Sequence, residues 1–141
     1  MFDAPASVAA VARAVHEAAT SMLSQSAMSR IADRRARLEQ RKQEMVAQAE
    51  AQAQADIKNG RLSGRVVGYE LGQLLEPETI VLNDGLSNGG FVQNYARRSQ
   101  PGTYFRSGSS SGGWGSGASL GVKLARPDQD VIHATGDGYF M

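Results

Sequence analysis

Two short apolar segments, each followed by a glycine-rich polar loop, constrain the fold of this chain more than any other feature. Residues 79–83 read TIVLN and precede the loop DGLSNGG, while residues 131–135 read VIHAT and precede Gly136-Asp137-Gly138. Apolar runs of this length, bounded by turn residues, are typical of buried strands. With helical sequence between them, they predict an α/β fold with a parallel sheet. Both loops would then lie at the carboxyl edge of the sheet, where such folds bind ligands.

The remainder of the chain is helical in pattern. Apolar residues recur at steps of three and four, proline and glycine mark the ends, and good helix formers fill the longest segment without interruption. Residues 103–106 (TYFR) form a candidate short third strand. The predicted helices span residues 6–23, 27–58, 65–75, 91–99 and 115–125.

Composition limits the class of protein. The 141 residues suffice for one domain or parts of two, and 41% hydrophobic with 21% charged residues is typical of a globular chain. The net charge of +1 gives no general attraction to nucleic acid or to an acidic membrane. The chain has no cysteine, and its first residues resemble neither a signal peptide nor a membrane span. We therefore expect a cytoplasmic protein without a membrane partner.

The long helix of residues 27–58 allows two interpretations. Its first half is basic, and its large apolar residues, Ile31, Leu38 and Met45, form one narrow stripe. A solvated face is favoured over a nucleic-acid contact, because no aromatic residues are interleaved to stack on bases. We therefore expect no nucleic-acid partner. A non-enzymatic interaction protein that uses residues 27–58 remains the alternative function.

An acidic residue between two glycines at a strand tip suits a hard cation. The glycines let the backbone approach a ligand closely, and the Asp137 carboxylate offers the oxygen that Mg²⁺ prefers. Gly-Asp-Gly is also an ordinary turn, so the triplet alone leaves both interpretations open. Trp114, which lies among glycines, is interpreted as a packing anchor for its loop and not as a substrate platform.

The segments NDGLSN (83–88) and PGTYFRSGSSSGGWGSGASLGVKLARPDQDVIHATGDG (101–138) resemble a known domain in order and spacing. It is the diphosphate-binding domain of thiamine-diphosphate enzymes of the acetolactate synthase and 2-oxoacid decarboxylase superfamily, in particular benzoylformate decarboxylase-like members. The resemblance implies an incomplete parallel-sheet thiamine-diphosphate-binding domain preceded by a long linker helix. Residues 1–25 would be the end of a central domain, 26–62 the linker helix, and 63–141 the first half of a truncated cofactor-binding domain.

The same resemblance assigns a metal ligand and contacts to the cofactor diphosphate. Asp137 would bind Mg²⁺, and the backbone around Gly136, with the N–H groups of Gly138 and Tyr139, would face the phosphate. Ser87 matches a family hydroxyl that contacts the diphosphate in the first loop. The neighbouring family hydroxyl is replaced by Leu86, which cannot donate, and Asn88 is the candidate substitute.

Two further positions would contact the organic part of the cofactor. The backbone carbonyl near Ser110 would accept a hydrogen bond from the aminopyrimidine. The family places a bulky apolar residue where this chain has Gly112, and that residue bends the cofactor into its reactive shape. Trp114 or another side chain would have to fill the space that Gly112 leaves.

The chemistry implied by the resemblance is that of thiamine diphosphate with Mg²⁺. The thiazolium carbanion attacks the carbonyl of a 2-oxoacid, and carbon dioxide leaves as the ring accepts the electrons. The activating glutamate would come from a partner subunit of a homo-oligomer, a dimer or a tetramer, so no residue of this chain is assigned a catalytic role. We expect the chain alone to be inactive and to lack micromolar affinity for the cofactor.

Overall fold

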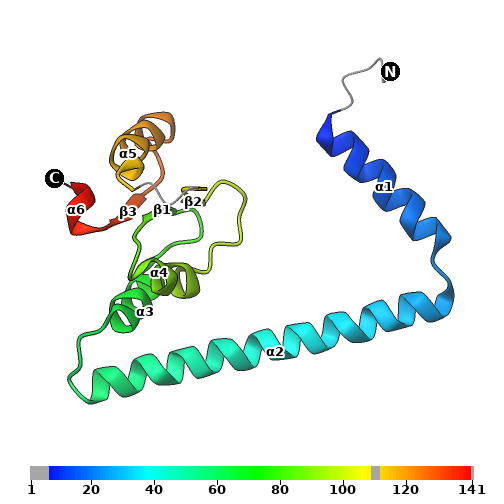
Figure 1. The fold of residues 1–141 in the computed structure, drawn as a ribbon, viewed down its shortest axis with the longest axis horizontal. Helices are drawn as coiled ribbons and strands as arrows, with labels where there is room; N and C mark the ends of the chain where they lie inside the picture. Colours follow the sequence, from blue (N-terminus) through cyan, green and yellow to red (C-terminus); the bar gives the residue numbers. More distant parts are fainter. Residues whose placement is uncertain (1–6, 109–111, 141) are drawn as a thin grey trace. The chain divides into compact units, whose positions relative to one another are not determined.

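A computed structural model of the chain describes residues 7–108 and 112–140. Its contacts divide the chain after Ala47 into two units. The first contains helix α1 (Val8–Met22) and the first part of helix α2 (Gln25–Lys58). The second contains the last turns of α2 and all later elements (Figure 1). The domain boundaries predicted after residues 25 and 62 rest on the resemblance and stay predictions.

The two N-terminal helices form where the apolar periodicity predicts them. The Ser7 side chain caps α1 by accepting from the Ala10 N–H at 3.2 Å. No residue of α1 is buried, and in α2 only Ala53 and Asp56 are, both in the second unit. The predicted apolar stripe of residues 31, 38 and 45 is therefore open to solvent in the first unit. Within the described ranges, no helix is long and apolar enough to cross a bilayer.

The second unit contains a three-stranded parallel sheet, which confirms the predicted fold class. Its strands are β1 (Ile80–Asp84), β2 (Tyr104–Arg106) and β3 (Val131–Thr135), in the spatial order β2-β1-β3. Both neighbours run parallel to β1. The chain is thus an α/β protein whose open sheet is preceded by a long helix. The candidate strand at residues 103–106 is confirmed as β2.

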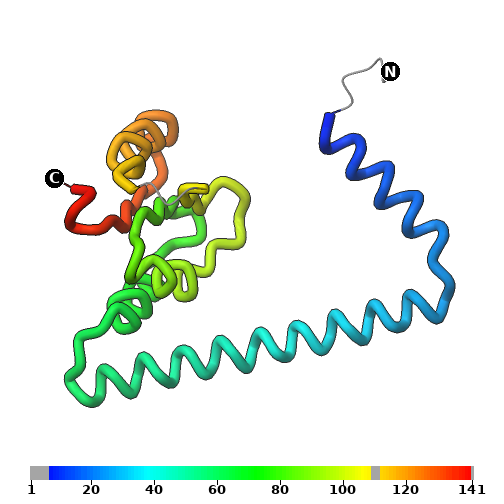
Figure 2. Tube along the Cα trace, viewed as in Figure 1, coloured from blue at the N-terminus to red at the C-terminus, as the bar shows by residue number. Residues whose placement is uncertain are grey.

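Helices cover both faces of the sheet. Helix α5 (Trp114–Ala125) contacts β1 and β3 from one side, and helix α4 (Gly89–Ala96) contacts them from the other (Figure 1; the trace is clearest in Figure 2). Helix α3 (Gly64–Leu74) packs on α4, and one turn of helix, α6 (Asp137–Phe140), follows β3. Such covering is what a parallel sheet requires.

The two apolar strands differ in burial. All five residues of β1 are buried, whereas all five of β3 are only partly buried. The prediction of two buried strands is therefore wrong for β3. The reason is its place in the sheet, since β1 has a strand on each side and β3 has a neighbour on one side only.

Glycines allow α3 and α4 to pack closely. A Cβ added at Gly68 would come within 2.9 Å of the Phe91 carbonyl oxygen. A Cβ added at Gly72 would overlap the carbonyl oxygen of Tyr95. Because both obstacles are backbone atoms, they cannot rotate away, and only hydrogen fits at these two positions.

Alternation along β1 points neighbouring side chains to opposite faces. Val81 packs with Val92 and Ala96 of α4, and Asn83 donates to the Gly89 carbonyl at the start of the same helix. The next residue, Asp84, accepts hydrogen bonds from the start of α5. The last two residues of β1 therefore organise different helices, which determines the shape of the site described next.

Candidate functional site

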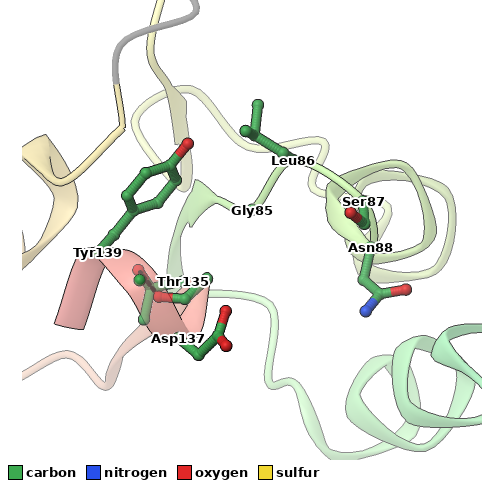
Figure 3. Close-up of a pocket in the computed structure, with 9 residues that line it drawn as sticks. Gly85, Leu86, Ser87, Asn88, Thr135, Asp137 and Tyr139 are labelled. Atoms are coloured by element: carbon green, nitrogen blue, oxygen red, sulfur yellow. Dashed lines mark hydrogen bonds between the residues drawn. The ribbon is translucent and has the colours of Figure 1, made fainter. Parts of the chain in front are cut away.

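A pocket of about 420 Å³ lies where β1 and β3 end. Because the two strands are parallel neighbours, the loops that follow them meet at the carboxyl edge of the sheet, as predicted. The volume lies within the range of small-molecule sites. Figure 3 shows the lining side chains of the two loops around this space. The lining residues are Gly85, Leu86, Ser87, Asn88, Thr135, Gly136, Asp137, Gly138 and Tyr139.

Asn83 fixes the first loop of the pocket. Its side chain is buried, and its Nδ2 donates to the Gly89 carbonyl at 2.7 Å and to the Tyr104 hydroxyl at 2.8 Å. Its Oδ1 accepts from the Gly85 N–H at 3.2 Å. One amide therefore joins β1, β2 and both ends of the loop, which holds Ser87 in place.

The first loop leads into the N-terminus of α4. Asn88 is the N-cap residue, but its side chain makes no capping hydrogen bond. That side chain instead lies beside the start of α3, since a Cβ added at Gly64 would overlap its Oδ1. A helix start without a side-chain cap has N–H groups that can receive an anion. Asn88 lines the pocket, and its role as a substitute for a hydroxyl donor stays a prediction.

Asp137 begins α6 at the opposite wall of the pocket. Its carboxylate extends toward the side on which Ser87 and Asn88 lie (Figure 3). It is exposed to solvent, and it is the one formally charged side chain among the described lining residues. In the described part of the chain, no three His, Asp or Glu side chains gather as a metal site. A metal at Asp137 would therefore take its other ligands from water and from a bound ligand.

The turn after β3 already uses one of the predicted phosphate donors. The Tyr139 N–H donates to the Gly136 carbonyl at 3.0 Å, which closes the turn. This N–H is therefore engaged within the protein, and the Gly138 N–H is the predicted donor that has no such bond among the described residues. The roles assigned to Gly136, Gly138 and Tyr139 stay predictions.

The Tyr139 ring fills the space beside Gly112. A Cβ added at Gly112 would overlap three atoms of this ring. The space next to Gly112 is thus occupied by an aromatic ring from the second loop of the pocket, while the expectation that a side chain there takes over the role of the family's bulky residue stays a prediction. Ser110, whose carbonyl is predicted to contact the aminopyrimidine, lies outside the described residues.

Sequence reasoning missed Asp84, which it assigned to the loop, and His133. The Asp84 side chain is 3% exposed. Its Oδ2 accepts from the N–H groups of Gly113 and Gly115, at 2.8 and 3.1 Å. The Nε2 of His133 lies 4.0 Å from the same oxygen and has no hydrogen-bond partner in the described ranges. One signal could have found Asp84: it ends a buried strand, and the glycines before α5 offer no capping side chain of their own.

The fold and the pocket together indicate the class of protein to which the second unit belongs. A parallel sheet with a ligand-sized pocket at its carboxyl edge, lined by a hydroxyl, a carboxylate and a helix start, is typical of α/β proteins that bind phosphate-containing ligands. Residues 85–141 match the family model described as thiamine pyrophosphate enzyme, C-terminal TPP binding domain. This match supports assigning the segment to the thiamine-pyrophosphate-binding domain of that enzyme family. Neither the curated proteins nor the solved structures give a significant match.

Proposed function

We propose that the pocket binds the diphosphate of thiamine diphosphate through a magnesium ion held by Asp137. The enzyme would be a 2-oxoacid decarboxylase or an acetolactate synthase-like protein. One observation carries the proposal: a single carboxylate lines the same pocket as the uncapped N-terminus of α4. The family match over residues 85–141 supports the identity of the cofactor.

The charges of the pocket require a cation if a diphosphate is to bind. The start of α4 attracts phosphate oxygens, whereas the Asp137 carboxylate repels them. No Lys or Arg is among the described lining residues to offset this repulsion. A divalent ion between carboxylate and phosphate turns the repulsion into attraction. Mg²⁺ is usually held by one or two carboxylates together with ligand phosphates and water, which fits this donor set.

Other residues of the pocket would hold the phosphate oxygens. The Ser87 hydroxyl and the Gly138 N–H are donors on opposite walls, while Leu86 offers none. The bound cofactor would supply the carbanion that attacks a 2-oxoacid and the electron sink for the departing carbon dioxide. The acid that activates the cofactor would belong to a partner subunit of a homo-oligomer. The Tyr139 ring, set against Gly112, would limit the pocket on the side of the second loop.

The proposal is tested by titrating the ¹⁵N-labelled chain with thiamine diphosphate, with Mg²⁺ and with a chelator in its place. Amide shifts should change around residues 85–88 and 136–138 only when the metal is present. Asp137→Asn should weaken binding by at least about tenfold, because changes even in the second shell of a metal site cost that much. Asp130→Asn is the matched control, since it removes the same charge from the other end of β3.

Two results would contradict the role proposed for Asp137. One is binding of equal strength with the metal and with the chelator, because the Asp137 carboxylate would then have no cation to hold. The other is an Asp137→Asn variant that binds as tightly as the Asp130→Asn control. Shifts confined to residues outside the two loops would likewise place the ligand elsewhere.

A further inference from the structure

We propose that Asp84 is a positioning residue that holds the loop residues Gly112 and Gly113 and the first turn of α5 against the end of β1. Through these loop residues Asp84 also fixes the position of the Tyr139 ring, which lies against Gly112 and lines the pocket. The effect of Asp84 on cofactor affinity rests on the proposed function, whereas its effect on the backbone of Gly113 and Gly115 does not. Asp84 directly precedes the segment that matches the cofactor-binding family model.

Helix α5 begins without a capping side chain of its own. The N-cap residue of this helix is Gly113, at φ 90°, which has no side chain to receive the first N–H groups. Asp84 supplies the missing oxygen from a position 29 residues earlier for the Gly113 N–H and 31 residues earlier for the Gly115 N–H. A carboxylate at this place is favoured by the hydrogen bonds and by the positive end of the helix dipole.

The Asp84 carboxylate also affects which helix start is open to an anion. Three of the described helices begin at the carboxyl edge of the sheet, and the starts of the two longer ones, α4 and α5, could each attract a phosphate. The Asp84 carboxylate already occupies the start of α5, while the start of α4 has no side-chain cap. An anionic ligand is therefore directed to α4, beside Ser87 and across the pocket from Asp137.

There is little room around the Asp84 carboxylate. A Cβ added at Gly115 would overlap the His133 imidazole and would lie 3.1 Å from the Asp84 Cβ. Gly115 is itself buried, so its N–H has little access to water if the carboxylate is removed. A buried donor left without a partner is costly, and the loop would have to move to satisfy it.

The loop connects Asp84 to the pocket. Gly113, which Asp84 holds directly, follows Gly112, and Gly112 lies against the Tyr139 ring. Release of the Gly113 N–H would therefore free the backbone that supports this ring. Because Tyr139 lines the pocket, the loss of Asp84 should be felt at the ligand although Asp84 is not among the lining residues.

The test compares Asp84→Ala, Asp84→Asn and the control Asp130→Ala by amide hydrogen exchange in the full chain. Exchange at Gly113 and Gly115 should rise by at least about tenfold in Asp84→Ala, and by a smaller factor in Asp84→Asn, which keeps a neutral acceptor. Amides inside β1 should change much less, and Asp130→Ala should leave all of these rates unchanged. If Asp84→Ala does not fold, a rise of amide exchange confined to Gly113 and Gly115 in Asp84→Asn supports the proposal.

Unchanged rates at Gly113 and Gly115, a uniform rise across the second unit, or equal losses in the Asn and Ala variants would overturn the proposal. Affinity for Mg²⁺–thiamine diphosphate is measured in parallel and should fall in the order Asp, Asn, Ala at position 84. If the unsubstituted chain shows no amide shifts even with millimolar cofactor and Mg²⁺, where the weak affinity expected of the chain alone would still be seen, the proposed function fails while the exchange data still test Asp84. If the chain binds and the Asp84 variants bind equally well, the link to the pocket is refuted.

Discussion

Replacing Gly72 by alanine should destabilise the second unit, whereas the same change at Gly121 should stabilise it. Both glycines lie inside helices, Gly72 in α3 and Gly121 in α5. A Cβ at Gly72 would overlap the backbone carbonyl oxygen of Tyr95, and a Cβ at Gly121 would meet no atom within 4 Å. The two substitutions therefore differ in their surroundings and not in their chemistry.

The magnitude follows from two opposing terms. Alanine is favoured over glycine inside a helix by about 0.8–1.0 kcal/mol, which applies at both positions. Overpacking against a backbone that cannot rotate away costs about 1–3 kcal/mol, which applies only at Gly72. Gly121→Ala should thus raise the free energy of unfolding by close to 1 kcal/mol. The difference between the two variants should equal the overpacking term of about 1–3 kcal/mol.

Urea unfolding followed by fluorescence measures this difference. The chain has a single tryptophan, Trp114, at the start of α5, so the signal reports the second unit. Equal slopes against urea for the three proteins would show that the substitutions alter stability and not the extent of unfolding. A Gly72→Ala protein as stable as Gly121→Ala would refute the close approach of α3 and α4. Loss of stability in Gly121→Ala would refute the open surroundings of α5.

Two other predictions concern the aromatic side chains. Gly112→Ala should lower the thermal midpoint, because its Cβ would overlap the Tyr139 ring, and Tyr139→Ala should remove most of this cost by making room. The unsubstituted chain, the two single variants and the double variant form a cycle that measures the coupling between the two positions. A coupling below about 0.5 kcal/mol would contradict the contact between Gly112 and Tyr139. Burial raises the pKa of Tyr95, whose hydroxyl donates to the Ala49 carbonyl at 2.7 Å. The folded state holds the Tyr95 proton more tightly than the unfolded state does. The resulting contribution to the free energy of unfolding is complete below the ordinary pKa of tyrosine and is lost as the pH rises through the raised pKa of Tyr95. Tyr95→Phe should therefore flatten the fall of the thermal midpoint between about pH 9 and 11, and an unchanged fall would assign it to other groups.

Most of the fold follows from local signals. The apolar runs at 79–83 and 131–135 correspond to β1 and β3 within one residue, because few other structures bury so short a run between turn residues. The helices begin and end within a few residues of their predicted limits, since capping and breaking residues act locally. Because β1 and β3 pair in parallel, the loops that follow them meet at one edge of the sheet. Ser87 of the first loop and Asp137 of the second therefore line the same pocket.

The parts that could not be predicted depend on contacts between distant segments. The partial burial of β3 results from its place at the sheet edge, which strand order decides and local sequence does not. The Tyr139 ring reaches Gly112 only after the sheet has formed. The pairing of Asp84 with the start of α5 also depends on the folded sheet: the strand end and the uncapped glycines are each visible in the sequence, but they lie 29 and 31 residues apart.

The order of the last two residues of β1 explains how one strand can keep one helix start open and close another. Asn83 points toward α4, where its amide shapes the loop without capping the helix, and Asp84 points toward α5, whose start it fills. A slip of one residue would reverse these directions and place the carboxylate under α4. The N-terminus proposed to receive the phosphate would then carry a fixed negative charge opposite Asp137. The pairing of β1 with β2 on one side and with β3 on the other holds this register, so the pocket owes its electrostatic character to the pairing of this strand.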